Sequence, residues 1–253
     1  MRLLIIQARL GSTRLQGKVL LPIEGKPLLQ RIVERLGNSD IVDQIIIATS
    51  NKEIDTPIED FARNLNVMCY RGSENDVLDR YYRAAQSVQS SANDTIIRVC
   101  ADNPLHHSDV MDFVLNQFEQ GDYDYFSNSN YEPDFLEDGF DVEVFRYWLL
   151  EKTWREATLP SDREHVCPYM KNPTQYKCGW KKYRKEYQFK LSVDTSEDLE
   201  AVRTIYKALL PVNPNFGIDD VLNLLNIKPE ILAINKDSII NAGYHKSIEE
   251  QKK

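Results

Sequence analysis

The chain has 253 residues, a formal net charge of −8 and four cysteines without C-x-x-C spacing. A single α/β domain over residues 1–253 is the simplest organisation. A domain of this size buries roughly 70–75% of the unfolded chain's surface, so it does not need disulfides or structural metals for stability. The acidic balance argues against a dedicated nucleic-acid-binding protein, and no stretch approaches the ~20 apolar residues of a membrane span. Because no signal peptide is recognisable either, we expect a cytoplasmic protein with reduced thiols.

The first expected element is a short buried strand at residues 3–6, which runs into a cationic loop. Residues 1–37 carry seven Lys or Arg against two Glu, so this part of the chain has a local charge of +5. The loop contains Gly11, Gly17 and Lys18. Glycines let a backbone approach an anion closely, and Arg and Lys donate to phosphate oxygens. Such a loop after a strand predicts a phosphate site at the carboxyl edge of an open α/β sheet.

The spacing of this loop excludes a Walker A loop. Five residues rather than four separate Gly11 from Gly17, and Val19 rather than Ser or Thr follows Lys18. A nucleoside triphosphate best matches so many cations, whereas the alternative is a surface turn with scattered charges.

Helices and strands alternate after the loop. The expected helices cover residues 27–37, 53–64, 76–90 and 108–121, and the expected strands cover 45–48, 67–70, 95–100 and 123–126. Arg98 interrupts the apolar run of the strand at 95–100. Adjacent side chains diverge, so His106 and His107 are expected to be loop or capping residues rather than metal ligands. The alternation predicts parallel βαβ units.

Residues 8–18 carry a recognisable motif, Ala8-Arg9-x-x-Ser12-x-Arg14-Leu15-x-Gly17-Lys18. The motif resembles the signature of the bacterial cytidylyltransferases that make CMP-activated acidic sugars, and it is most similar to the branch named for spore-coat polysaccharide biosynthesis. Gln16 stands where proline is usual. The resemblance implies a three-layer, Rossmann-like nucleotidyltransferase fold with a mostly parallel sheet and a small β-arm for dimerisation. It also implies that CTP is bound by Ala8, Arg9, Gly11, Ser12, Arg14 and Lys18.

Two aspartates are expected to form a metal site. Asp102 follows the fourth expected strand, and Asp194 ends a later run of alternating apolar residues that we expect to be a strand. An isolated Asp-x-Pro sequence is usually an ordinary turn, but both positions match metal-binding aspartates of the resembled family, with Ala101 in place of a glycine. The resemblance therefore implies that Asp102 and Asp194 hold Mg²⁺, that Asp102 also contacts the nucleotide, and that Lys18 and Arg14 complete the catalytic set.

Arg71 follows the expected strand at 67–70. The resemblance implies that Arg71 contacts the base of the nucleotide. The residues alone equally fit a strand-to-helix turn with Ser73 near the helix cap.

The acceptor is expected to contact two further segments. Asp141 and Glu143 alternate with apolar residues, so their carboxylates share a face that suits sugar hydroxyls, a metal or only water. Arg163 and His165 lie in an Arg-Glu-His sequence that matches a block of the family. The resemblance implies that Asp141, Glu143 and His165 contact the sugar and that Arg163 pairs with its carboxylate. The alternative is an ordinary helix start with acidic residues near its positive end.

Residues 177–190 carry six Lys or Arg interleaved with aromatic residues, among them Tyr187. Such interleaving suits a nucleic-acid groove, but we interpret this segment as a hairpin arm. The arm would belong to an excursion over about residues 123–190 that binds the sugar and a second subunit, and the resemblance implies a homodimer. Helices are expected at 147–157 and 219–226, and Ser196 is expected to cap another.

These expectations describe a cytidylyltransferase. A sugar hydroxyl would attack the α-phosphorus of CTP, pyrophosphate would leave, and the product would serve surface polysaccharide biosynthesis. The expected acceptor is an acidic 2-keto-3-deoxy sugar, whose carboxylate would suit Arg163. One alternative is a nucleotide-sugar-dependent glycosyltransferase that uses Asp141-Val142-Glu143 as its metal motif, which explains the cations of the first loop less well. The other is a non-catalytic nucleotide-binding protein.

Overall fold

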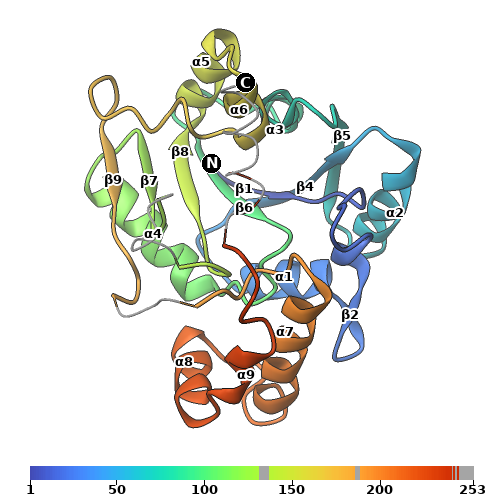
Figure 1. Ribbon diagram of the computed structural model, residues 1–253. Coiled ribbons are helices and arrows are strands. Elements are labelled where there is room, and N and C mark those ends of the chain that lie inside the picture. The colour runs from blue at the N-terminus through green and yellow to red at the C-terminus, as the bar shows by residue number, and fades with distance from the viewer. Residues whose placement is uncertain (131–136, 186–188, 241, 243, 245–253) are drawn as a thin grey trace.

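The computed structural model describes residues 1–130, 137–185, 189–240, 242 and 244. Helices cover both faces of a mostly parallel sheet, so the predicted three-layer α/β fold is confirmed (Figure 1). The strands of this sheet are β1 (Arg2–Gln7), β4 (Gln44–Ser50), β5 (Met68–Gly72), β6 (Thr95–Cys100), β7 (Tyr125–Ser127), β8 (Glu143–Arg146) and β9 (Cys178–Trp180). Their order is β5-β4-β1-β6-β8-β7-β9, and β2 (Pro22–Ile23) and β3 (Lys26–Pro27) form a separate small hairpin.

Strand directions follow from the pairing of neighbours. β1 pairs in parallel with β4 on one side and with β6 on the other, and β4 pairs in parallel with β5. β8 is antiparallel to both β6 and β7, and β7 pairs in parallel with β9. Only β8 therefore runs against the direction of the other six strands in the described sheet.

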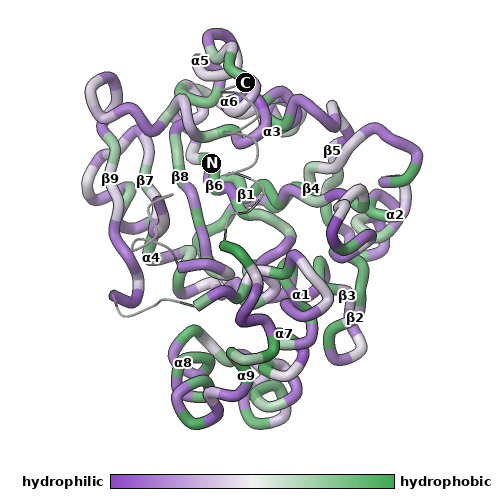
Figure 2. The backbone as a smooth tube through the Cα atoms, in the orientation of Figure 1, coloured by the Kyte–Doolittle hydropathy of each residue, from purple (hydrophilic) through white to green (hydrophobic). Residues whose placement is uncertain are grey.

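The sheet is buried on both faces because successive side chains of a strand point to opposite sides. Leu4 and Ile6 of β1 pack into the core under one helical layer, whereas Leu3 and Ile5 pack into the core under the other. Figure 2 shows hydrophobic stretches running through β1 and β4 in the middle of the molecule. The first layer includes α1 (Leu28–Leu36), α2 (Thr56–Asn64), α4 (Ser108–Gln120), α7 (Ser196–Leu209), α8 (Ile218–Ile227) and α9 (Glu230–Ala233). The second consists of α3 (Val77–Ser87), α5 (Tyr147–Glu156) and α6 (Pro160–His165).

Helix boundaries mostly follow their predicted signals. Pro27 and Gly37 flank α1, and the side chain of His107 caps α4 by accepting the N–H of Asp109, as a capping role predicts. The prediction for α7 was wrong by one residue. Thr195 rather than Ser196 is the cap, because its hydroxyl accepts the N–H of Asp198 in a reciprocal capping box.

Two predicted β elements were wrong. Residues 189–193 form an irregular extended segment rather than a strand, because the side chain of Asp138 accepts the N–H groups of Leu191 and Ser192 at 2.7 and 2.8 Å. The segment expected as a hairpin arm contributes β9 to the edge of the main sheet instead. Tyr187 lies outside the described residues.

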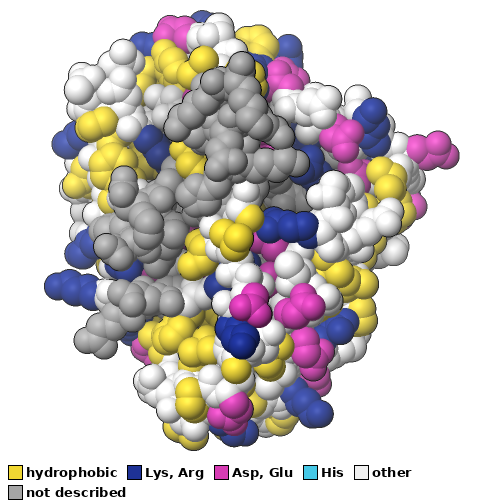
Figure 3. Space-filling view, viewed as in Figure 1, with side chains coloured by type: hydrophobic (Ala, Val, Ile, Leu, Met, Phe, Trp, Pro, Cys, Tyr) yellow, Lys and Arg dark blue, Asp and Glu magenta, His cyan; other side chains and the backbone are white. Residues whose placement is uncertain are grey.

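The surface carries charges of both signs. On the face shown in Figure 3, Lys and Arg are interspersed with Asp and Glu over α2 and α7. No helix in the described part of the chain combines the length and apolar character needed to cross a membrane.

Gly139 fixes the contact between residues 137–140 and the irregular segment. Its φ is +95°, and a Cβ at this position would lie 2.9 Å from the Cβ of Leu191. We predict that Gly139→Ala lowers the free energy of unfolding by about 2–4 kcal/mol, because a strained backbone and an overpacked contact add together. Gly25→Ala is the matched control: its φ is +78° but no atom lies within 4 Å of the added methyl. Equal losses for the two variants in urea unfolding would contradict this packing role.

Candidate active site

The candidate site lies at the carboxyl end of β1, where the strand order reverses. The chain continues from β1 to β4 and β5 on one side and then returns to β6 on the other. Open α/β sheets bind ligands at such switch points. Here the described residues form a cavity of about 440 Å³, lined from β1 and its loop by Gln7, Arg9 and Arg14, from β6 and its loop by Arg98, Cys100, Asp102 and Asn103, and from later segments by Asp138, Asp141, Glu143, His165, Lys171 and Asp194, among others.

The loop after β1 is folded back on itself. The N–H of Gly17 donates to the carbonyl of Leu10 at 3.0 Å, and Gly17 adopts a left-handed φ of +69°. The N–H of Leu10 donates to the carboxylate of Asp55 at 2.7 Å. This closed loop delivers Lys18 into a short 3-10 turn, Lys18–Leu20. Arg9 and Arg14 of the loop line the cavity, whereas Ala8, Gly11 and Ser12 lie on the loop without lining it.

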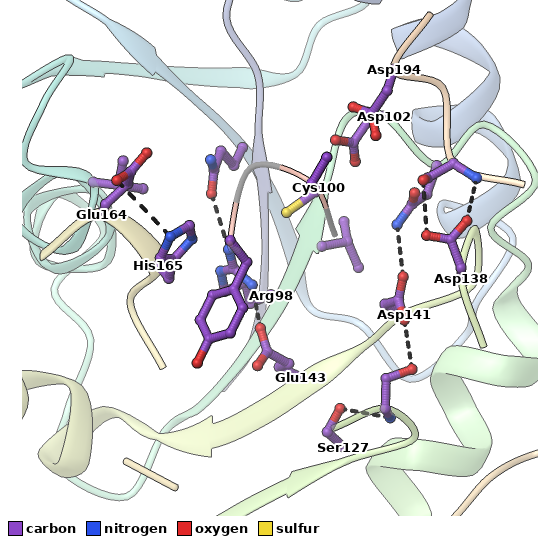
Figure 4. A pocket seen from close by; sticks show the side chains of 18 of the residues that line it. Arg98, Cys100, Asp102, Ser127, Asp138, Asp141, Glu143, Glu164, His165 and Asp194 are labelled. Atoms are coloured by element: carbon purple, nitrogen blue, oxygen red, sulfur yellow. Dashed lines mark hydrogen bonds and ion pairs between the residues drawn. The ribbon is translucent and has the colours of Figure 1, made fainter. Parts of the chain in front are cut away.

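Lys18 brings the predicted metal ligands together. Its buried Nζ lies 3.4 Å from Oδ2 of Asp102 and 3.1 Å from Oδ1 of Asp194, and it donates to the carbonyl of Val193 at 2.6 Å. Arg14 Nη2 lies 2.9 Å from the same oxygen of Asp194. Residues far apart in the sequence therefore converge at one point, and Figure 4 shows Asp102 and Asp194 beside each other at the edge of the cavity.

A second lysine, Lys190, was not predicted to belong to the site. Its Nζ lies 3.3 Å from Asp194 and 3.4 Å from Asp198. Burial alone would lower the pKa of Lys190, but the carboxylates of Asp138, Asp194 and Asp198 outweigh burial and raise it. Burial likewise favours a higher pKa for Asp194, but Lys18, Lys190 and Arg14 lower it. Asp194 is therefore held as a carboxylate.

The donor set suits Mg²⁺. Asp102 and Asp194 both contact one Nζ atom, so their oxygens border the same small volume. No cluster of three or more His, Cys, Asp or Glu side chains that would hold a metal occurs among the described residues. Magnesium commonly binds through one or two carboxylates and completes its shell with water and substrate phosphates, so two carboxylates beside a phosphate-binding loop fit this ion.

Glu143 lines the cavity and is paired with two cations. It pairs closely with Arg98 of β6, lies 2.9 Å from Lys171 Nζ and accepts the hydroxyl of Tyr125 at 2.7 Å. Burial would raise the pKa of Glu143, but Lys171 and Arg98 hold it well below the usual range. Glu143 was predicted to contact the sugar directly, whereas its described partners are two protein cations and the hydroxyl of Tyr125. Sequence reasoning missed both cations, although a charged Arg98 within an apolar strand was a usable signal.

Asp141 and His165, the two other residues predicted to contact the sugar, line the cavity. Asp141 accepts the hydroxyl of Ser129, and burial together with the nearby carboxylate of Asp138 raises its pKa to about 8. Burial and the charge of Arg98 lower the pKa of His165 to about 4, so its imidazole is neutral at pH 7. The His165 ring meets the ring of Tyr244 edge to face at 5.1 Å between centroids.

Two residues that were predicted to belong to the site, Arg71 and Arg163, bind other protein groups. Arg71 donates to the carbonyls of Ser50 and Lys52 and to the side chains of Thr56 and Glu59, and it does not line the cavity. Arg163 donates through two nitrogens to the carboxylate of Asp76, the residue that caps α3. The structure thus uses Arg71 to fasten the loop after β4 and Arg163 to fasten α6 to α3. The predicted contacts of Arg71 with the base and of Arg163 with the sugar stay predictions.

Comparison with known proteins identifies the family. The profile described as "Cytidylyltransferase" matches residues 3–222. The chain belongs to the cytidylyltransferase family. It is 34% identical to the spore coat polysaccharide biosynthesis protein SpsF of Bacillus subtilis over 90% of this chain and 95% of that protein. A solved cytidylyltransferase from Leptospira borgpetersenii superposes with a TM-score of 0.83 at 30% identity, covering 94% of this chain and 98% of the other.

A third similarity is confined to part of the chain. The 3-deoxy-manno-octulosonate cytidylyltransferase 2 of Hydrogenovibrio crunogenus is 35% identical over 119 residues, which is 47% of each chain. As a member of the cytidylyltransferase family, the present chain is a CTP-dependent nucleotidyltransferase. This confirms the class of activity that the loop motif predicted.

The cytidylyltransferase should gain stability when Asp141 cannot ionise. The pKa of Asp141 in the folded state is about 8, above its ordinary value of 3.8. Between these two pH values the folded state keeps a proton that the unfolded state releases, so the free energy of unfolding falls as pH rises. We predict that Asp141→Asn raises Tm by about 2–4 °C at pH 9 and has a much smaller effect at pH 4. Asp122→Asn, on a side chain that is 90% exposed, should show no such pH-dependent difference. A Tm difference for Asp141→Asn that stays constant across pH would contradict the raised pKa.

Arg163 should behave as a structural residue of the cytidylyltransferase. We predict that Arg163→Gln lowers the free energy of unfolding by about 1–3 kcal/mol, because it removes charged hydrogen bonds from Asp76 at the start of α3. The KM for the acceptor should change by less than about threefold, which corresponds to well under 1 kcal/mol. Chemical denaturation and steady-state kinetics on the same preparation measure both quantities. A large increase in KM without loss of stability would restore the original interpretation of Arg163 as a substrate contact.

Proposed function

We propose that this cytidylyltransferase transfers CMP from CTP to a hydroxyl of a sugar, with release of pyrophosphate, for surface polysaccharide biosynthesis. The observation that carries the proposal is the convergence of Lys18, Arg14, Asp102 and Asp194, of which the last three line one cavity. The names of the relatives supply the acceptor class: SpsF belongs to polysaccharide biosynthesis, and the Hydrogenovibrio enzyme is named for 3-deoxy-manno-octulosonate. An acidic 2-keto-3-deoxy sugar is therefore the proposed acceptor.

The chain's own groups account for the handling of the triphosphate. The sugar hydroxyl attacks the α-phosphorus and releases its proton to water, the bond from that phosphorus to the bridging oxygen breaks, and pyrophosphate departs with the electron pair. Such transfers are catalysed mainly by positioning and charge stabilisation. Arg9, Arg14 and Lys18 orient the phosphates and stabilise the charge on the departing pyrophosphate. Asp102 and Asp194 would hold Mg²⁺, whose chemistry is to neutralise phosphate charge and polarise the reacting group.

The acceptor would occupy the cavity beside β8. Asp141 and His165 offer a carboxyl and a neutral imidazole to its hydroxyls. Arg71 and Arg163 are left out of the proposed site because both guanidinium groups bind protein groups and neither residue lines the cavity. Cytosine recognition is inferred from family membership, and the homodimer and the cytoplasmic location stay predictions.

The cationic loop disfavours the glycosyltransferase alternative, in which Asp141 and Glu143 would hold the metal. Arg9, Arg14 and Lys18 match the charge of a triphosphate better than that of a sugar nucleotide. Incubation with CTP, Mg²⁺ and an acceptor panel distinguishes the possibilities: the proposed enzyme releases pyrophosphate and forms a CMP-sugar, a glycosyltransferase consumes a finished sugar nucleotide and releases nucleotide, and a non-catalytic protein releases neither.

Removing one carboxylate of the converging pair should abolish turnover. We predict that Asp102→Asn lowers kcat at least about 100-fold while Tm changes little, by analogy with the loss of one charge-stabilising group in a closed site. Asp60→Asn is the matched control, because this aspartate on α2 has a side chain that is 59% exposed. Pyrophosphate release measured with saturating CTP and Mg²⁺ tests the prediction. Near-wild-type turnover by Asp102→Asn would exclude the proposed role of this carboxylate.

A further inference from the structure

We propose that a second cavity, between α1 and α7, binds a phosphate group at a site separate from the candidate active site. The described residues line a space of about 360 Å³ there, and none of them also lines the candidate active site. In Figure 1, α1 and α7 lie next to each other in the lower half of the view. This inference does not depend on the transfer reaction proposed above.

Two arginines of α1 carry buried positive charge into this cavity. Arg31 and Arg35 both line it, and they are only 7% and 5% exposed. Their printed hydrogen bonds all go to backbone carbonyls, which are those of Ile23, Glu24, Leu105, His106 and Phe216. Carbonyls fix the two guanidinium groups in place but carry no net charge. Both cations are therefore held rigidly and without a carboxylate partner among the described residues.

Each of these guanidinium groups keeps one nitrogen for a ligand. The carbonyls accept from Nε and Nη2 of both arginines, and no described residue accepts from Nη1 of Arg31 or of Arg35. Neither Nη1 atom is fully enclosed by protein, so these nitrogens are open to a ligand in the cavity that the two arginines line. Guanidinium N–H groups are well suited to phosphate oxygens. Because the remaining bonds already fix both side chains, little rotamer freedom is lost on binding.

The charge of the cavity favours a dianion. Among the described residues that line it, Lys26 is a third cation and Glu34 is the only acid, and Glu34 accepts from Lys26 Nζ at 2.7 and 2.8 Å. Three cations against one carboxylate leave two positive charges. Burial and the charge of Arg31 lower the pKa of Arg35, as expected for a cation that lacks a counter-ion. A phosphate monoester carries about −1.5 to −2 charges at pH 7, which matches this excess.

Two neighbouring groups act on Arg35 in the opposite direction but do not neutralise it. The hydroxyl of Tyr206 donates to the carbonyl of Pro104 at 2.5 Å, and burial raises the pKa of Tyr206 to about 12, so this phenol is neutral at pH 7. Asp220 accepts the N–H of Gly217 at 2.9 Å at the start of α8 and does not line the cavity. The cost of two buried, unpaired cations therefore stays until an anion binds.

The rest of the wall indicates the kind of molecule that carries the phosphate. Leu210 and Pro214 add apolar surface, and the ring of Tyr206 lies beside the arginines. At the exposed rim, the amide of Asn38 donates to that of Asn215 at 3.1 Å. The space is within the size range of small-molecule sites and exceeds what a bare phosphate fills. We therefore assign it to the phosphate group of a small phosphate monoester, for which free phosphate is the alternative source.

Calorimetry without Mg²⁺ tests this site with two probes, ribose 5-phosphate and inorganic phosphate, and with ribose as the uncharged control. Saturable binding of either phosphate compound, but not of ribose, supports the inference. Tighter binding of ribose 5-phosphate assigns the apolar wall to the organic part of the ligand, whereas equal binding assigns the site to free phosphate. Absence of saturable binding by both phosphate compounds overturns the inference and leaves cytidylyl transfer intact.

Variants show which cavity holds the phosphate. Arg31→Gln should raise the Kd about 10–100-fold, the effect of losing one hydrogen bond to a charged group. Arg14→Gln, in the candidate active site, should leave the Kd within about twofold. Equal binding by wild type and Arg31→Gln, or loss of binding in Arg14→Gln, overturns the assignment.

A variant at the rim keeps the test decisive if Arg31→Gln folds poorly. Asn38→Asp adds a negative charge at an exposed position of the cavity wall. It should raise the Kd about two- to fivefold, the effect of one exposed charge–charge interaction. Asn93→Asp is the matched control, because Asn93 is exposed in the turn before β6 and lines neither cavity. Equal Kd values for these two variants would contradict binding in this cavity.

Discussion

The ammonium group of Lys18 between two carboxylates is the interaction on which the site depends. It links the loop after the first strand to Asp102 at the end of β6 and to Asp194 before α7, segments that are 84 and 176 residues away in the chain. Without a ligand, this cation satisfies two carboxylates that would otherwise repel each other. In the proposed reaction, the same three groups would exchange partners for a triphosphate and a divalent ion. Arg14, whose Nη2 lies 2.9 Å from Asp194, adds a second cation, so two cations face the two carboxylates.

The surrounding fold holds this set in place through backbone hydrogen bonds. Asp138 accepts two N–H groups of the irregular segment before Asp194, and Val193 N–H donates to the carbonyl of Asp102 at 2.7 Å. Asp198 accepts the N–H of Asp194 at 2.9 Å, so the first turn of α7 positions the carboxylate that precedes it. In a regular strand at 189–193, these N–H groups would donate to a neighbouring strand. The irregular backbone is thus what places Asp194 opposite Lys18.

Sequence patterns predicted the elements whose signals are local. The apolar run of β1, the apolar spacing of α1 and the loop motif up to Lys18 each depend on neighbouring residues, and all lie where they were expected. Residues whose partners are distant in the chain were beyond the reach of these patterns. Nothing near Arg163 in the sequence indicates that Asp76 will be its partner, and the alternating pattern before Asp194 gives no sign that Asp138 will bind its backbone. For the same reason, sequence analysis did not identify Lys171 and Lys190. Both contact carboxylates that only the fold brings close to them.

The most direct test of this account is the affinity for CTP measured by calorimetry with and without Mg²⁺, in wild type and in Asp194→Asn. If Asp102, Asp194 and Lys18 act on one polyphosphate, Mg²⁺ should tighten CTP binding to wild type, and this tightening should disappear in the variant. An unchanged magnesium dependence in Asp194→Asn would contradict the account, because the metal would then be held by other groups.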